Sequence, residues 1–426
     1  MKKIYTLLCI FFTSTITLTA QHTIIHCGNL IDGKTNDVQP QMSIIIEGNK
    51  ITAVEKGFSK PGKDDNVIDL SKKTVMPGLI DMHVHLENET NKDINLQRFT
   101  LNDADIAFRS TVYAKKTLLA GFTSVRDLGG SGVNIALRNA INQGLVTGPR
   151  IFTAGKSVAT TGGHADPTNG YRKDLMGDPG PKEGVINGPE DARQAVRQRY
   201  KDGSDLIKIT ATGGVLSIAK DGSGPQFTDE ELKAIIETAK DYNMHTAAHA
   251  HGAEGMKRAV LAGITTIEHG TKMTEEVMDL MIEKGTYYVP TITAGRFVGD
   301  QAKVPGYYHP LVVPKALEIG PQIQRTFGKA YKRGVRIAFG TDAGVFPHGE
   351  NGKEFTFMVE AGMPAIEAIK SATIINAGIL GMADKIGTLE VGKLADIVAT
   401  DDNPLKNIKT MESVSFVMKE GVVYKP

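Results

Sequence analysis

The middle of the chain alternates short apolar runs with segments in which apolar residues recur every three or four positions. The first pattern is typical of buried strands and the second of amphipathic helices. Their alternation predicts parallel βαβ units, and eight of them predict an α/β fold of the TIM type, a closed (β/α)₈ barrel. The expected strands are Gly78–His85, Gly121–Asp127, Arg150–Ala154, Asp205–Thr210, His245–Ala250, Thr265–His269, Tyr287–Thr293 and Val335–Gly340.

Helical periodicity fills the gaps between these strands. Thr228 followed by Glu231 predicts a capping box at the start of one helix. A doubly wound open sheet is the structural alternative, but no glycine-rich phosphate-binding fingerprint opens the first unit. The expected helices include Asp191–Tyr200, Glu230–Tyr242, Glu275–Lys284 and Pro364–Leu380.

Short β-rich runs separated by turn signals lie near both ends of the chain. One set lies in residues 23–76 and the other follows Gly387. Neither set is long enough to bury a sheet alone, so we expect the two to pair in a small β-sandwich domain. The predicted organisation is a first β-sandwich part in residues 21–76, a barrel in residues 77–386 and a second β-sandwich part in residues 387–426.

Residues 1–20 combine Lys2 and Lys3 with a short apolar stretch that ends near Ala20. This composition is typical of a secretory signal peptide. The stretch is too short and too rich in Thr and Ser to favour a membrane span. We therefore expect a secreted or periplasmic protein that is free of the membrane after signal cleavage.

The overall charge excludes one broad class of function. Lys and Arg number 49 against 48 for Asp and Glu, which leaves a formal charge of +1. No basic field is present to hold nucleic acid. A small-molecule substrate is the expected partner, and a homo-oligomer is left open.

Histidine and aspartate recur at the carboxyl ends of the predicted strands. His83 and His85 are two positions apart and therefore share a strand face. His249, His269 and Asp342 follow later strands, and a barrel brings such ends into one ring. Nitrogen and oxygen ligands without thiolate suit a divalent metal, zinc first, with manganese, cobalt or iron as alternatives.

Lys208 lies within an apolar, buried-type strand. An isolated ammonium is costly to bury, so it needs a partner or must lose its charge. One interpretation is a lysine that reaches solvent or pairs with a carboxylate. The other is a lysine carboxylated by CO₂, whose carbamate would bridge two metal ions.

The run VMPGLIDMHVH, from Val75 to His85, resembles the strand-1 signature of the amidohydrolase superfamily. Lys208 and the later His and Asp residues fall in that family's order, and the segment from Gly387 to Asp396 resembles its return to the β-sandwich. The runs GGHAD at 162–166, TGGV at 212–215 and HAHG at 249–252 are similar to its carboxylated-lysine branch of prolidase-like (Xaa-Pro dipeptidase-like) and ochratoxinase-like enzymes. Imidazolonepropionase is a relative that lacks the bridging lysine and uses one metal.

The resemblance implies two divalent metal ions and a reaction path. His83, His85 and Asp342 would hold the first ion, His249 and His269 the second, and carboxylated Lys208 would bridge them. A hydroxide between the metals would attack the amide carbon, and Asp342 would carry its proton to the leaving amine. The implied ligand set is His83, His85, Lys208, His249, His269 and Asp342.

The long connections at 156–188 and 295–314 follow strand ends, where loops in compact barrels are usually functional. On the first loop, His164 is expected to polarise the carbonyl or stabilise the oxyanion, with a solvent-facing role as the alternative. Tyr171 and Arg172 offer a donor and a planar fork for a substrate carboxylate.

Two of these substrate assignments have a structural alternative. Arg172 is flanked by Asp174 and Asp178, so it is expected either to bind substrate or to form an ion pair on the surface. His251 shares a face with His249, and either contacts substrate or fills the pocket.

We therefore expect a hydrolase that cleaves the linear amide bond of dipeptides or N-acyl amino acids. An imidazolonepropionase-like or other cyclic-amide hydrolase or deaminase is the rival enzyme, and Lys208 favours the two-metal branch over it. A non-enzymatic scaffold protein is the third hypothesis. It predicts that some metal ligands are missing, but here every position that matches a ligand of the family is filled.

The exported protein is expected to begin near Gln21, because the basic start, apolar core and Ala20 form a cleavable signal. Intact-mass analysis of secreted material checks this cleavage. A mass that includes residues 1–20 would contradict it.

Overall fold

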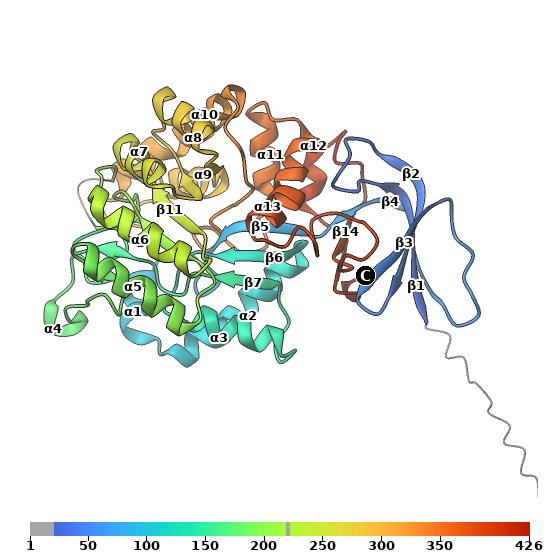
Figure 1. The fold of residues 1–426 in the computed structure, drawn as a ribbon, viewed down its shortest axis with the longest axis horizontal. Coiled ribbons are helices and arrows are strands. Elements are labelled where there is room, and N and C mark those ends of the chain that lie inside the picture. Colours follow the sequence, from blue (N-terminus) through green and yellow to red (C-terminus); the bar gives the residue numbers. More distant parts are fainter. Residues whose placement is uncertain (1–20, 219–221) are drawn as a thin grey trace, which may run out of the picture.

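The computed structural model describes residues 21–218 and 222–426. The predicted signal peptide lies outside these residues. Figure 1 shows a body of strands and helices, beside which the blue N-terminal strands lie together with the red C-terminal strand β14. Among the described residues, no helix combines the length and apolar character needed to cross a bilayer.

The elements follow the predicted alternation in the body and the predicted β texture at the ends. The strands of the described residues are β1 (His22–Leu30), β2 (Gln39–Glu47), β3 (Lys50–Lys56), β4 (Asn66–Pro77), β5 (Leu79–Val84), β6 (Phe122–Asp127), β7 (Arg150–Thr153), β8 (Ala159–Thr160), β9 (Val185–Ile186), β10 (Ile207–Thr210), β11 (Thr246–Ala250), β12 (Thr266–His269), β13 (Tyr287–Val289), β14 (Ile397–Thr400), β15 (Phe416–Lys419) and β16 (Val422–Lys425). The helices are α1 (Ile94–Thr100), α2 (Asp103–Leu119), α3 (Val133–Asn142), α4 (Lys173–Met176), α5 (Pro189–Asp202), α6 (Asp229–Asp241), α7 (Ala253–Ala262), α8 (Glu275–Lys284), α9 (Ile292–Gln301), α10 (Val313–Arg333), α11 (Lys353–Glu360), α12 (Ala365–Lys370) and α13 (Asn376–Ile379), with a π-helical turn at Ser371–Ile375 and a 3₁₀ turn at Ile408–Glu412.

The two chain ends share one seven-stranded sheet of order β16-β15-β14-β4-β1-β2-β3. Strand β4 joins them, because it pairs parallel to β1 and antiparallel to β14, with Met76 opposite Val398. The edge strand β3 bonds to the segment before β14, where the Ile51 N–H donates to the Lys393 carbonyl at 2.9 Å. The sheet therefore curves around an apolar core that contains residues of both chain ends, including Ile44. Its division into two sandwich layers stays a prediction.

The strands of the body run parallel in two sets, β5-β6-β7 and β10-β11-β12-β13. Most lie within the predicted ranges, α8 has the predicted bounds, and Thr228 and Glu231 form the predicted capping box of α6. Helices cover the outside of these strands in Figure 1. The body is therefore α/β, with the carboxyl ends of consecutive strands at one edge.

The last predicted strand, Val335–Gly340, is not a regular strand. Within the part of the chain that the structure describes, this stretch forms isolated bridges rather than a continuous ladder, Ile337 with Tyr288 and, just beyond it, Ala343 with Val84. At Phe339 the backbone is shared with partners outside the sheet. Its carbonyl accepts from the Met82 N–H of β5 at 3.0 Å and also from Asn376 Nδ2 at 2.9 Å, and its N–H donates to the Ser371 carbonyl at 3.3 Å. Tertiary partners outside the sheet thus replace part of a regular ladder.

The predicted strand at Tyr287–Thr293 and the predicted loop at 295–314 were both too long. Strand β13 ends at Val289, and helix α9 occupies the first part of the expected loop, up to Gln301, despite its two glycines. The glycines have a packing reason, since the Cα of Gly299 would lie 3.2 Å from a Cβ added at Gly320 of α10. Close contact between the two helices therefore outweighs the low helix propensity of glycine.

Replacing Arg150 by Met is expected to lower the free energy of unfolding by about 3–5 kcal/mol, because it leaves the buried carboxylate of Asp396 without its cationic partner. Arg150 Nη1 binds Asp396 Oδ2 at 2.9 Å and Ser124 Oγ at 2.7 Å, and Asp396 is almost fully buried. Urea denaturation measures the loss. The control is Arg193→Met, which removes an exposed pair with Glu190 and should cost less than about 1 kcal/mol. Equal losses in both variants would contradict the expectation.

Candidate metal centre

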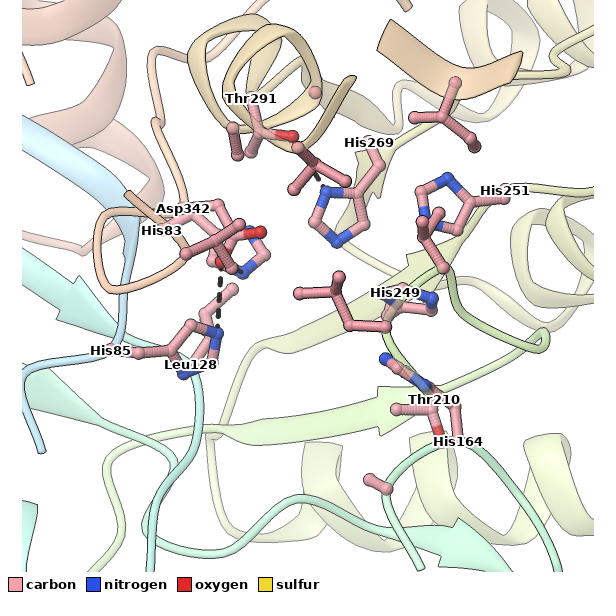
Figure 2. A pocket seen from close by; sticks show the side chains of 18 of the residues that line it. His83, His85, Leu128, His164, Thr210, His249, His251, His269, Thr291 and Asp342 are labelled. Carbon is pink, nitrogen blue, oxygen red and sulfur yellow. Dashed lines mark hydrogen bonds and ion pairs between the residues drawn. The ribbon is translucent and has the colours of Figure 1, made fainter. Parts of the chain in front are cut away.

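A cavity of about 200 Å³ opens at the carboxyl ends of the body strands. Figure 2 shows His83, His85 and Asp342 on one side, His249, His251 and His164 on the other, and His269 between them. The structure therefore brings together every residue of the predicted ligand set, together with His164 and His251. The cavity is lined by His83, His85, Leu128, Ser157, His164, Ala165, Lys208, Thr210, Val215, Leu216, His249, His251, His269, Thr291, Ala294, Gly295, Val298, Ile319, Ile323, Asp342 and Val345.

Strand register sets the positions of these side chains. In the parallel ladder Thr210 of β10 lies opposite His249 of β11, and Ala250 opposite His269 of β12. Lys208 lies one pleat below the end of β10, on the same face as Thr210. Three separate strands thus contribute adjacent polar groups to one edge.

Asp342 is the acidic group of the centre. Its Oδ1 lies 3.4 Å from His83 Nε2 and 3.3 Å from His85 Nε2. Burial raises the pKa of Asp342, but the two histidines outweigh burial and hold that pKa below its usual value. For His85, burial lowers the pKa, and the hydrogen bond and charge of Asp342 reverse this and raise it. The carboxylate is therefore ionised at neutral pH.

The remaining central histidines are neutral. Burial, with the charge of Lys208, lowers the pKa of His83 to about 4. Burial also lowers the pKa of His249 and His269 well below the ordinary value, aided by the neighbouring histidines. Each ring therefore keeps a nitrogen lone pair at neutral pH, as metal coordination requires.

One ring nitrogen each of His85, His249 and His269 lies close to an oxygen atom of a neighbouring group, so the other nitrogen does not share that contact. His85 Nδ1 lies 2.8 Å from the Gly129 carbonyl and His269 Nδ1 lies 2.8 Å from Thr291 Oγ1. His249 Nε2 lies 3.2 Å from the Gly213 carbonyl. Such partners fix ring orientation in metal sites.

Glu268 and Arg126 extend this pattern and were missed by the sequence reasoning. Glu268 Oε2 lies 2.9 Å from His83 Nδ1, and Glu268 Oε1 accepts from Arg126 Nη2 at 2.8 Å. Burial opposes ionisation of Glu268, but Arg126 and His83 outweigh it and lower the pKa to about 2. The available signal was a charged residue inside each of two buried strands, the same signal that drew attention to Lys208.

Lys208 is only 4% exposed. Among the described residues its Nζ forms no hydrogen bond or ion pair, and Glu268 and Asp342 act on it only through their charge. Burial lowers the pKa of Lys208 to about 8, which raises the fraction of neutral amine. In the described structure, Lys208 therefore neither reaches solvent nor pairs with a carboxylate, which were the predicted alternatives.

Three residues around the centre have a left-handed backbone, with φ of 69° at His269, 52° at Thr291 and 63° at Asp342. This conformation costs a non-glycine residue about 1–3 kcal/mol, and a β-branched Thr is especially unsuited to it. Strain of this kind persists only where surrounding contacts impose it. Its concentration here marks the strand ends as a functional edge.

His164 stacks on His249 with ring centroids 4.3 Å apart. A side chain at Gly214 would overlap its ring, so this glycine of the TGGV run makes room for His164. Burial, with the charge of Lys208, lowers the pKa of His164 to about 4, and its buried Nδ1 has no partner in the described structure. His251 is held by Thr271, with Nδ1 2.9 Å from Oγ1.

Tyr171 and Arg172 do not line the cavity. The Arg172 side chain is 75% exposed and forms a fork with Asp174, with Nε to Oδ1 at 3.1 Å and Nη2 to Oδ2 at 2.6 Å. Tyr171 packs against Phe99. The expected carboxylate clamp is therefore replaced by its alternative, a surface ion pair with the carboxylate two residues away.

The donor set fits a divalent metal. The ligand atoms of His83, His269 and Asp342 all lie within 4.8 Å of one another. Asp342 Oδ1 is buried and makes no hydrogen bond of good geometry in the described structure, although the His83 and His85 rings lie within ion-pair distance of it. Nitrogen and carboxylate oxygen together suit zinc and similar ions.

Residues 74–424 match the model of the Amidohydrolase family. Ochratoxinase from Aspergillus niger is 32% identical over 427 residues, which cover 95% of this chain and 87% of that protein. A solved Xaa-Pro dipeptidase with bound methionine in its active site is 54% identical, with a TM-score of 0.93 and coverage of 95% of this chain and 100% of that one. A prolidase complexed with N-methylphosphonate-L-proline is 32% identical, with a TM-score of 0.86 and the same coverage. The resemblance seen in the sequence is thereby confirmed, and the chain belongs to the amidohydrolase family, as a metal-dependent hydrolase of carbon–nitrogen bonds.

Proposed function

We propose that the chain is a binuclear amidohydrolase that cleaves the linear amide bond of dipeptides or N-acyl amino acids. The observation that carries this proposal is the buried Lys208. It lies among neutral histidines, and its amine has no hydrogen-bond or ion-pair partner in the described part of the chain. A second ion needs a bridging ligand, and a carbamate on Lys208 supplies one. A centre for a single ion gives no reason to bury an unpaired amine at this point.

The proposed ligands are the six residues of the sequence-based set. Two divalent cations, when bound, lower the pKa of water and polarise the scissile carbonyl. His83, His85 and Asp342 are assigned to one ion, His249 and His269 to the other, and carboxylated Lys208 to both. Zinc is the first choice, because the donors are imidazole and carboxylate.

Asp342 is the proposed proton carrier. Its carboxylate is ionised, and its buried Oδ1 faces the Nε2 atoms of His83 and His85. It can therefore take the proton of the attacking water and deliver it to the leaving amine, acting first as base and then as acid. His164 offers a buried imidazole to the carbonyl oxygen, where negative charge develops.

The apolar wall of the cavity supports a substrate with an uncharged side chain. Helix α9 contributes Ala294 and Val298, and helix α10 contributes Ile319 and Ile323. An ionic side chain placed against this wall would lose its hydration without gaining a partner. The relatives named for ochratoxin, for Xaa-Pro dipeptides and for prolidase activity support an amide whose leaving group is an amino acid.

We also infer that the body closes into a (β/α)₈ barrel with the domain bounds expected from the sequence. Support comes from residues 336–343, where the Met82 N–H donates to the Phe339 carbonyl at 3.0 Å and the Ala338 N–H donates to the Tyr288 carbonyl at 2.9 Å. This stretch thus bonds to β5 on one side and to β13 on the other. Secretion through the signal in residues 1–20 belongs to the same proposal.

Lys208→Ala is expected to lose bound metal together with turnover, because the bridging carbamate can no longer form. Elemental analysis should give two ions per native chain, and bicarbonate should speed reconstitution of the native apo-protein but not of the variant. Lys233→Ala, on the exposed face of α6, is the matched control and should keep both ions. Retention of two ions and near-normal kcat by Lys208→Ala would reject the carbamate.

A screen of dipeptides and N-acyl amino acids with zinc-loaded mature protein tests the proposed reaction. The kcat/KM of substrates with an apolar side chain on the acyl residue is expected to be about 10-fold or more above that of substrates with Lys or Glu there. The reason is that burying an unpaired charge is costly. Arg172→Met should leave every kcat/KM within about 2-fold, since exposed ion pairs contribute little. Hydrolysis of lactams or deamination of heterocycles, with no cleavage of linear amides, would favour the rival enzyme.

A further inference from the structure

Glu354 lies at the first turn of α11 and is fully buried. Its carboxylate points at the N-terminus of a different helix, α9. Oε1 accepts from the Ile292 N–H at 2.8 Å, while Oε2 accepts from the Thr293 N–H at 2.8 Å and from Thr293 Oγ1 at 2.6 Å. These amides belong to the first turn of α9, whose N–H groups have no partner within the helix. Glu354 therefore acts as an N-cap supplied from a distant part of the chain.

Thr291 is the N-cap residue of α9, yet its side chain does not cap the helix. A Thr at this position usually accepts a hydrogen bond from an amide of the first turn. Here its Oγ1 instead lies 2.8 Å from Nδ1 of His269, across the cavity wall, as Figure 2 shows. The hydroxyl is available to His269 because Glu354 already satisfies the amides that the hydroxyl would otherwise serve.

The backbone conformation of Thr291 also indicates that its surroundings hold it in place. Its φ of 52° is left-handed, which a β-branched residue adopts only when its surroundings impose it. The Thr291 N–H is fixed by the Gly340 carbonyl at 3.2 Å, and the two following residues are fixed by Glu354. The chain is thus held on both sides of the residue that orients His269.

We propose that Glu354 and Thr291 are positioning residues for the metal centre: Glu354 holds the start of α9, and Thr291 thereby fixes the ring of His269 with its free nitrogen toward the cavity. This inference rests on the proposed role of His269 as a ligand. It assigns a function to a buried carboxylate that belongs neither to the ligand set nor to the path of the proton.

Zn²⁺ affinity of the apo-protein, measured by competition with a chromophoric chelator, is the test. Helix α9 also lines the cavity, so activity alone would not separate positioning from substrate contact. Thr291→Val keeps the branched shape and removes the hydroxyl, and it should lower the affinity of the weaker-bound ion by about 10- to 100-fold. Thr291→Ser should restore affinity to within about 3-fold of the native value, since it returns the hydroxyl. Glu354→Gln should lower affinity by about 10-fold, because an amide presents N–H groups to at least one of the backbone donors.

The matched control is Glu231→Gln. Glu231 is also a buried carboxylate that accepts backbone N–H bonds at a helix start, from Thr228 and Gly188, but it lies away from the cavity. Its variant should lose thermal stability and keep native Zn²⁺ affinity. Native affinity in folded Thr291→Val would overturn the inference, and that variant decides the matter if Glu354→Gln does not fold. His269→Ala separates the two proposals: native affinity in that variant would instead overturn the ligand assignment itself.

Discussion

At the centre of the body, Arg126 of β6 and Glu268 of β12 form an ion pair with both side chains fully buried. Removing two charges from water is expensive, so such a pair persists only when further hydrogen bonds satisfy each partner. Arg126 Nε meets this need by donating to the Met82 carbonyl of β5 at 2.7 Å, and Glu268 meets it at His83. Three strands and one proposed ligand therefore depend on a single buried pair, and loss of either partner would leave the other charge uncompensated.

The predictable part of the fold came from local pattern. Apolar runs located most body strands, and the two-residue alternation of His83 and His85 placed both rings against Asp342. The errors occurred where tertiary contacts override local preference. Phe339, in the last predicted strand, donates its N–H to the turn after α12, and the first amides of α9 bond to a carboxylate that lies some sixty positions later in the chain.

The same distinction applies to the site. Residues that occupy the cavity were recognisable, because their types and spacing carry the chemistry. Glu268, Arg126 and Glu354 lie outside the cavity and act on those residues through hydrogen bonds to partners far away in sequence, and Thr291 does the same from the cavity wall. Arg172 shows the converse error, since a plausible residue type on the expected loop is held outside the cavity by its neighbour Asp174.

Strand β4 also bears on how the chain reaches this structure. It continues almost directly into β5, the first strand of the body, yet its partner β14 lies near the other end of the chain. A ribosome releases the N-terminal strands long before that partner exists, and one side of β4 stays an open edge meanwhile. Contacts of such sequence separation form slowly because of their loop-closure entropy. Strand β4, although it is among the earliest strands to be synthesised, is thus among the last to complete its pairing.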